Sequence, residues 1–132
     1  MQRRYLVVAA AVLLAVVPVA AHHSFSAEYD ARAPVRLTGV VSKIEWSNPH
    51  VYIYVDVKDE NGNVATWSME GRPPNALARA GFTRQLVSVG DTVTITGFRA
   101  RDNALRASAR EVATSDGKKY TFGGPGEFTK QL

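Results

Sequence analysis

Residues 51–70 read VYIYVDVKDENGNVATWSME and decide the fold of this chain. In the first half, aliphatic residues alternate with Tyr52, Tyr54 and Asp56, which is the period-two pattern of a β-strand. Asn61-Gly62 then marks a tight hairpin turn, and apolar residues alternate again from Ala65 onward. The stretch therefore predicts two antiparallel strands with an aliphatic inner face and an outer face that carries tyrosines.

The segment before this hairpin predicts a long, bent first strand. Val35 and Leu37 share one face, and the later apolar residues Val40, Ile44 and Trp46 fall on the opposite parity. Gly39 lies where the parity of the apolar residues changes. A β-bulge at Gly39 would bring all of these side chains to the same side, so we predict a bulge there.

The segment after the hairpin predicts a short helix and further strands. The helix has a proline start at Pro73 and a glycine stop at Gly81. Alternating apolar residues follow from Val93 and from Leu105, and residues 120–122 have the pattern of a short final pairing.

These elements favour one small all-β domain. Three strands, a short helix and two strands, with a long bent first strand, are typical of an OB-type barrel. We therefore predict an all-β fold with one short helix, a five-stranded OB-like barrel over residues 35–122. Another small antiparallel barrel or a sandwich has similar local patterns and is the alternative.

The N-terminus has the order of a secretory signal peptide. Arg3 and Arg4 precede an apolar run of roughly 13 residues, which ends before the small residues Val19 and Ala21. A bilayer core needs about 20 apolar residues, so a permanent membrane anchor is disfavoured. We predict a signal peptide over residues 1–21 and a periplasmic or secreted protein.

Cleavage after Ala21 would leave an extended arm over residues 22–34, the domain, and a flexible tail over 123–132. A cut after Ala20 is the alternative. The formal charge of +4 includes Arg3 and Arg4, so the mature chain would carry about +2. With no basic patch, nucleic acid is a poor candidate ligand.

The chain has three histidines, and two of them would stand at the mature start. These are His22 and His23, and the third is His50 in the Asn-Pro-His connection before Val51. Imidazole is the commonest protein ligand for copper and zinc, and a free amine on His22 would add a nitrogen. We predict a metal site, copper first and zinc second, at His22, His23 and His50. Alternatively, the paired histidines are exposed and His50 satisfies a hydrogen bond in its turn.

Aromatic residues on the first strands suggest a second function. Trp46, Tyr52 and Tyr54 lie where OB barrels bind ligands, whereas Trp67 shares the parity of the core. The alternative hypothesis is a metal-free interaction module that docks an envelope protein or a glycan on this face. The chain has no cysteine and no recognisable catalytic set, so we do not expect an enzyme.

Several motifs resemble a family of small exported bacterial proteins of unknown function. They are the His22-His23-Ser24-Phe25 start, Glu28-Tyr29-Asp30, the stretch Glu45 to His50 with its Asn-Pro-His turn, and the segment Glu70 to Ala80. The resemblance implies export and one domain, and it brings no activity, substrate or cofactor. It also makes the three histidines the first residues to test.

Overall fold

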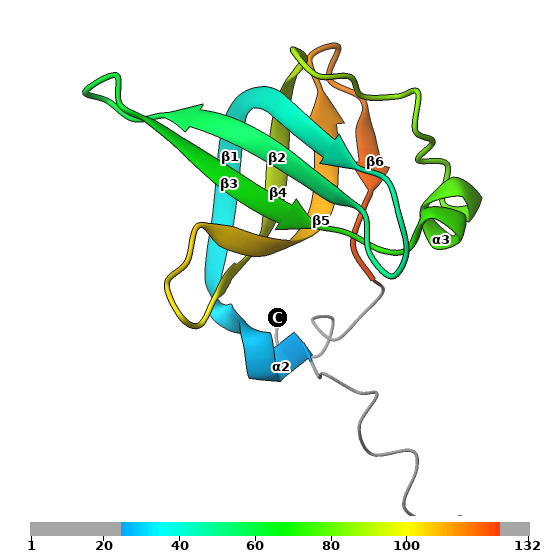
Figure 1. Cartoon of the computed structure of the whole chain (residues 1–132), viewed down its shortest axis with the longest axis horizontal. Coiled ribbons are helices and arrows are strands. Elements are labelled where there is room, and N and C mark those ends of the chain that lie inside the picture. The colour runs from blue at the N-terminus through cyan, green and yellow to red at the C-terminus, as the bar shows by residue number, and fades with distance from the viewer. Residues whose placement is uncertain (1–24, 125–132) are drawn as a thin grey trace, which may run out of the picture.

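The computed structural model describes residues 25–124 (Figure 1). The predicted signal peptide, His22, His23 and residues 125–132 of the predicted tail lie outside the described residues. The elements, in chain order, are α2 (Phe25–Glu28), β1 (Tyr29–Glu45), β2 (Tyr52–Lys58), β3 (Val64–Glu70), α3 (Pro74–Arg79), β4 (Thr92–Ala100), β5 (Arg106–Thr114) and β6 (Lys119–Thr121). Within residues 25–124, no helix is long and apolar enough to span a membrane.

The strands form one sheet in the order β3-β2-β1-β4-β5-β6, and an additional parallel pairing joins β3 to β5. Five of them, β1 to β5, are thereby connected in a ring. The long β1 pairs with β4 through its first part and with β2 through its last part, and Figure 1 shows it curving over the top of the molecule between the two. The prediction of a mostly β-sheet fold with a long bent first strand is confirmed.

The predicted hairpin and short helix are both present. Strands β2 and β3 pair antiparallel from Tyr52 opposite Glu70 to Lys58 opposite Val64. Helix α3 has its proline in the first turn, and Phe82 follows it into the core. Trp67 is 9% exposed, which confirms its predicted inward orientation.

The predicted bulge at Gly39 is wrong in position. Val40 is 45% exposed and Val41 only 1%, and the register irregularity lies between Val41 and Lys43. Val40 pairs with both β2 and β4, so β1 changes partners at this point. A Cβ atom on Gly39 would overlap the carbonyl of Asp56, so the glycine allows a close approach of two strands.

The start of the domain also differs from the predicted arm. Phe25–Glu28 forms a helical turn, and β1 begins at Tyr29, so Tyr29 to Pro34 already belong to the strand. The pairing with β4 is irregular between Tyr29 and Pro34. Because of this irregularity, inward and outward side chains do not alternate regularly over these residues, and the sequence pattern there does not predict a strand.

The core of the domain is aliphatic with a cluster of aromatic rings at one end. Phe82 is 1% exposed, and its ring contacts those of Trp46, Tyr120 and Phe122. The backbone of the predicted tail is held at its first residue, because the Gly123 amide donates to the Arg110 carbonyl at 3.0 Å. Trp46 belongs to the connection between β1 and β2 that also carries His50, so its contact with Phe82 attaches this connection to the core.

Candidate functional site

His50 lies in the connection between β1 and β2, after a cis Asn48–Pro49 peptide. Its Nδ1 atom is 3.0 Å from the carbonyl oxygen of Gly71. Because a carbonyl only accepts hydrogen bonds, Nδ1 carries the hydrogen and donates it. In the neutral ring, Nε2 then has a free lone pair, and the side chain is 42% exposed.

The carboxylate of Glu70 faces this nitrogen. Its Oε1 atom is 3.6 Å from Nε2 of His50, and its Oε2 atom accepts a hydrogen bond from the hydroxyl of Tyr29. Glu70 is the last residue of β3 and pairs with Tyr52 of β2. We call His50, Glu70, Tyr29 and Tyr52 the His50–Glu70 site.

Both tyrosines of this site keep their protons at neutral pH. Burial, together with the hydrogen bond to Glu70, raises the pKa of Tyr29 well above its ordinary range. Burial, followed by the charge of Glu70, raises the pKa of Tyr52 to about 12. The guanidinium of Arg106 lies 5.8 Å from the centre of the Tyr29 ring, which further encloses the site.

The first described residues are attached next to this site. The ring of Phe25 stacks on that of Tyr29 with 5.5 Å between centroids. Arg101 bonds to two carbonyls of this segment, through its side chain to Ser26 at 2.7 Å and through its amide to Glu28 at 2.9 Å. The segment that follows His22 and His23 is thus held beside Tyr29.

The predicted metal ligands are only partly described. His22 and His23 lie outside the described residues, and His50 has the contacts given above. Within residues 25–124, no group of three or more histidine, cysteine, aspartate or glutamate side chains is arranged to hold a metal ion. His50 and Glu70 are therefore a pair of donors and not a complete metal site.

The predicted aromatic face divides into two parts. The rings of Tyr52 and Tyr54 lie 6.5 Å apart, and both are half-buried. Lys43 covers the Tyr54 ring at 5.0 Å, and the Tyr54 hydroxyl donates to Glu45 at 3.1 Å. Trp46 stacks on Phe82 instead, with 6.2 Å between centroids, and so packs against the core.

Neither Tyr29 nor Glu70 is among the site residues predicted from the sequence, although both lie in motifs that carry the family resemblance. A signal for Glu70 was present, because a hairpin centred on Asn61-Gly62 pairs Glu70 with Tyr52. Alternation then puts both side chains on the outer face. For Tyr29 no local signal exists, since its contact with Glu70 joins residues that are 41 positions apart.

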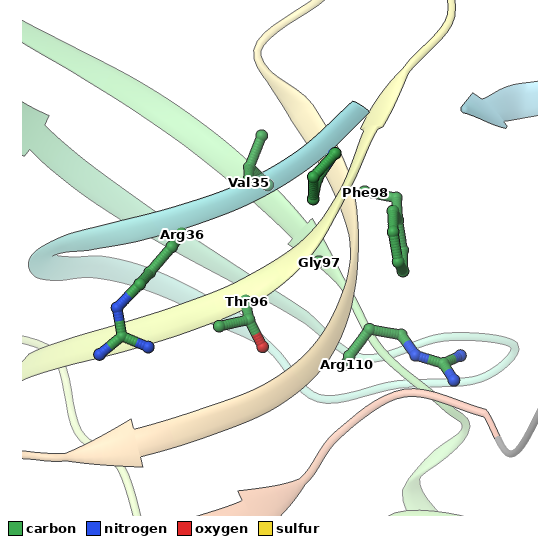
Figure 2. Close-up of a pocket in the computed structure, with 7 residues that line it drawn as sticks. Val35, Arg36, Thr96, Gly97, Phe98 and Arg110 are labelled. Atoms are coloured by element: carbon green, nitrogen blue, oxygen red, sulfur yellow. The ribbon is translucent and has the colours of Figure 1, made fainter. Parts of the chain in front are cut away.

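A separate apolar groove crosses β1, β4 and β5 (Figure 2). It has a volume of about 410 Å³ and is lined by Pro34, Val35, Arg36, Thr96, Gly97, Phe98 and Arg110. Figure 2 shows the side chains of Arg36 and Arg110 on either side of Thr96. None of the predicted site residues lines this groove.

Comparison with known proteins finds one family. Residues 10–108 match the model of a family described as a family of unknown function, DUF6152. This bears out the resemblance to an uncharacterised family. No curated protein and no solved structure matches the chain.

Proposed function

Because the chain belongs to the family of unknown function DUF6152, we propose its function from its own residues: it is an exported, non-enzymatic protein that binds a transition metal ion, copper first. The proposed ligands include His22, His23 and His50. We further propose that the ring of five strands is an OB-like barrel, since its order 1-2-3-5-4 with a shared first strand is that of OB folds.

The observation that carries the metal proposal is the state of His50. Its Nδ1 hydrogen is bonded to the Gly71 carbonyl, and this leaves the lone pair of Nε2 available to a metal ion at the protein surface. Metal-binding histidines commonly have their second nitrogen bonded to a backbone carbonyl in this way, which fixes the tautomer and orients the ring. A histidine with a purely structural role would use Nδ1 for the Gly71 carbonyl and, when protonated, Nε2 for an ion pair with Glu70, so the metal titration below decides between the two roles.

The attachment of Phe25 supports the participation of His22 and His23. His22 and His23 precede Phe25 by three and two residues in the sequence. Phe25 contacts Tyr29, Tyr29 contacts Glu70, and Glu70 faces His50. The first described residue of the chain is therefore linked to His50 through two side chains, which supports the proposal that the histidines before it take part.

The donor types favour copper(II) or zinc. Imidazole nitrogens suit both ions, and a free amine on His22 would add the nitrogen-rich coordination that copper(II) prefers. The chain has no cysteine, so thiolate coordination does not contribute. Copper is the first choice because it forms the more stable complexes with nitrogen donors.

The test is a titration of the purified exported protein with copper(II) and zinc, against a chelator of known affinity, after mass spectrometry has established its N-terminus. We expect submicromolar copper affinity that falls at least tenfold in His50→Ala and in a protein with a blocked amine. The control is Gln85→Ala, an exposed residue between α3 and β4. Binding that is absent, or indifferent to His50, would overturn the metal proposal.

Export is tested separately. A full-length chain expressed in a bacterium should be recovered from the periplasm without residues 1–21, and a chain that lacks those residues should remain in the cytoplasm. Recovery of the uncleaved full-length chain from the cytoplasm would contradict export and, with it, the contribution of a free His22 amine to the metal site.

The second candidate is a metal-free module that docks an envelope protein or glycan. The adjacent rings of Tyr52 and Tyr54 favour it, since two neighbouring aromatic rings form a small stacking surface. Lys43 already covers one of these rings, which weakens the case. Retention of the protein on purified envelope glycan that is lost in a Tyr52→Ala, Tyr54→Ala double variant, with no metal bound, would select this function.

A further inference from the structure

The contacts of Glu70 extend the proposed metal site by one ligand and one supporting residue. We propose that Glu70 supplies a carboxylate oxygen to the metal ion bound by His50, and that Tyr29 is the positioning residue that holds this carboxylate in place. The inference rests on the proposed metal-binding function. Within the described residues, the proposed site has one nitrogen ligand, Nε2 of His50, and one oxygen ligand, Oε1 of Glu70, and it binds a divalent cation.

Two atoms with lone pairs face each other, Nε2 of His50 and Oε1 of Glu70. With Nδ1 bonded to the Gly71 carbonyl, Nε2 of the neutral His50 ring is an acceptor, and Oε1 of the ionised Glu70 carboxylate is also an acceptor. Two acceptors at 3.6 Å gain nothing from each other unless a cation stands between them. The cation is either a proton on His50 or a metal ion.

The distance between Nε2 of His50 and Oε1 of Glu70 is close to that expected for two ligands of one metal ion. A metal ion bound to both atoms at about 2.0–2.2 Å holds them roughly 3–3.5 Å apart in tetrahedral or square-planar geometry. The observed separation of Nε2 and Oε1 is 3.6 Å. A small rotation of either side chain brings the two atoms to the separation that a shared metal ion requires. The His50 side chain is 42% exposed, so a metal ion and further ligands can reach Nε2 from the solvent.

Tyr29 holds the Glu70 carboxylate in position. Its hydroxyl donates to Oε2 of Glu70, so the carboxylate is turned with Oε1 toward His50. Tyr29 is itself 3% exposed, and its ring contacts the ring of Phe25 and the guanidinium of Arg106. A ligating carboxylate held by a second hydrogen bond is a recurrent feature of metal sites, and loss of such a partner typically weakens binding 10- to 100-fold, to order of magnitude.

Tyr29 also contacts the first described residue of the chain. Its ring stacks on Phe25, which is two residues after His23, while its hydroxyl reaches Glu70. Correct placement of the carboxylate and attachment of the N-terminal segment therefore depend on the same side chain. A change that removes only the hydroxyl separates these two roles.

The experiment compares three variants of the exported protein in a copper(II) titration with electron paramagnetic resonance. Glu70→Gln keeps the shape and an acceptor for Tyr29 but removes the charge, and it should weaken copper at least tenfold and change the spectrum. Tyr29→Phe keeps the ring contacts but removes the hydrogen bond to Glu70, and it should weaken copper about tenfold or more. The matched control is Glu45→Gln, a carboxylate that also accepts from a tyrosine but pairs with Lys43 instead of a histidine.

The outcomes separate this inference from the proposed function. An unaltered protein that binds no metal overturns both. An unaltered protein that binds copper while Glu70→Gln shows the same affinity and spectrum overturns the role of Glu70 alone. Melting curves without metal show which variants are folded, and if Glu70→Gln does not fold, an unchanged affinity in Tyr29→Phe overturns the inference instead.

Discussion

The ring of Phe122 packs against Gly71 so closely that a Cβ atom on Gly71 would overlap the Cε1 atom of the ring. The two segments are also hydrogen-bonded, since the amide of Arg72 donates to the Phe122 carbonyl at 3.1 Å. The carbonyl of Gly71 accepts the Nδ1 hydrogen of His50. The end of the described chain therefore supports the backbone that orients His50.

We predict that Gly71→Ala destabilises the protein by about 1–3 kcal/mol, because the added methyl group must displace a buried aromatic ring. Urea denaturation at pH 7 measures this. The control is Gly124→Ala, where a Cβ atom meets no other atom within 4 Å. Equal unfolding midpoints for Gly71→Ala and the unaltered protein would contradict the packing described here.

The aromatic end of the core should contribute a large part of the stability. Phe82→Ala removes a ring that contacts Trp46, Tyr120 and Phe122, and we expect a loss of about 3–5 kcal/mol. Val89→Ala, at a residue that is 62% exposed, should change stability by less than about 0.5 kcal/mol. Chemical denaturation followed by tryptophan fluorescence distinguishes these values, and similar midpoints for the two variants would refute the prediction.

Tyr52 should make stability depend on alkaline pH. Burial and the charge of Glu70 raise its pKa from 10.0 to about 12 in the folded protein. A raised pKa means that the neutral hydroxyl is favoured by folding, so this contribution is complete below pH 10 and is lost as the pH rises toward 12. We predict that Tyr52→Phe loses less stability than the unaltered protein between pH 9 and pH 11.5.

The measurement for Tyr52 is the free energy of unfolding at several pH values, with a chelator present to exclude metal. Absorbance at 295 nm follows the tyrosine ionisation directly. An identical pH dependence in Tyr52→Phe and the unaltered protein would show that this hydroxyl ionises at its ordinary pKa.

The hairpin turn between β2 and β3 should depend on the ionised form of Asp59. Its Oδ1 atom accepts from the amides of Asn61 and Asn63 at 2.9 and 2.8 Å, and these bonds lower the pKa of the carboxyl group. A lowered pKa stabilises the fold above the unfolded value, and this contribution is lost as the pH falls through the folded value.

Asp59→Ala should therefore be less stable than the unaltered protein at pH 7, and the difference should shrink in acid, well below pH 4. Unfolding by urea at the two pH values measures it. Glu60→Ala, at the neighbouring exposed carboxylate, should show neither effect. A difference for Asp59→Ala that is the same at both pH values would show that the charge of the carboxylate is not involved.

Most individual elements were predictable because their signals are local. The alternation over residues 51–57, the Asn61-Gly62 turn and the proline start of α3 each depend on residues a few positions apart. The hairpin even contains the register that pairs Tyr52 with Glu70. The proximity of Tyr52 and Glu70 could therefore have been predicted from the sequence.

Residue patterns alone are thus sufficient to predict the order and type of the elements from Val35 onward, and with them the inward side of β2 and β3. The start of β1 at Tyr29, the irregularity after Val41 and the place of Trp46 at the aromatic end of the core follow only from the folded chain. The tertiary structure alone brings Tyr29 to Glu70 and Glu70 to His50. The physical reason is that alternation reports which way a side chain points from its own strand, whereas these contacts depend on how the bend in β1 and the closure of β3 on β5 bring distant segments together.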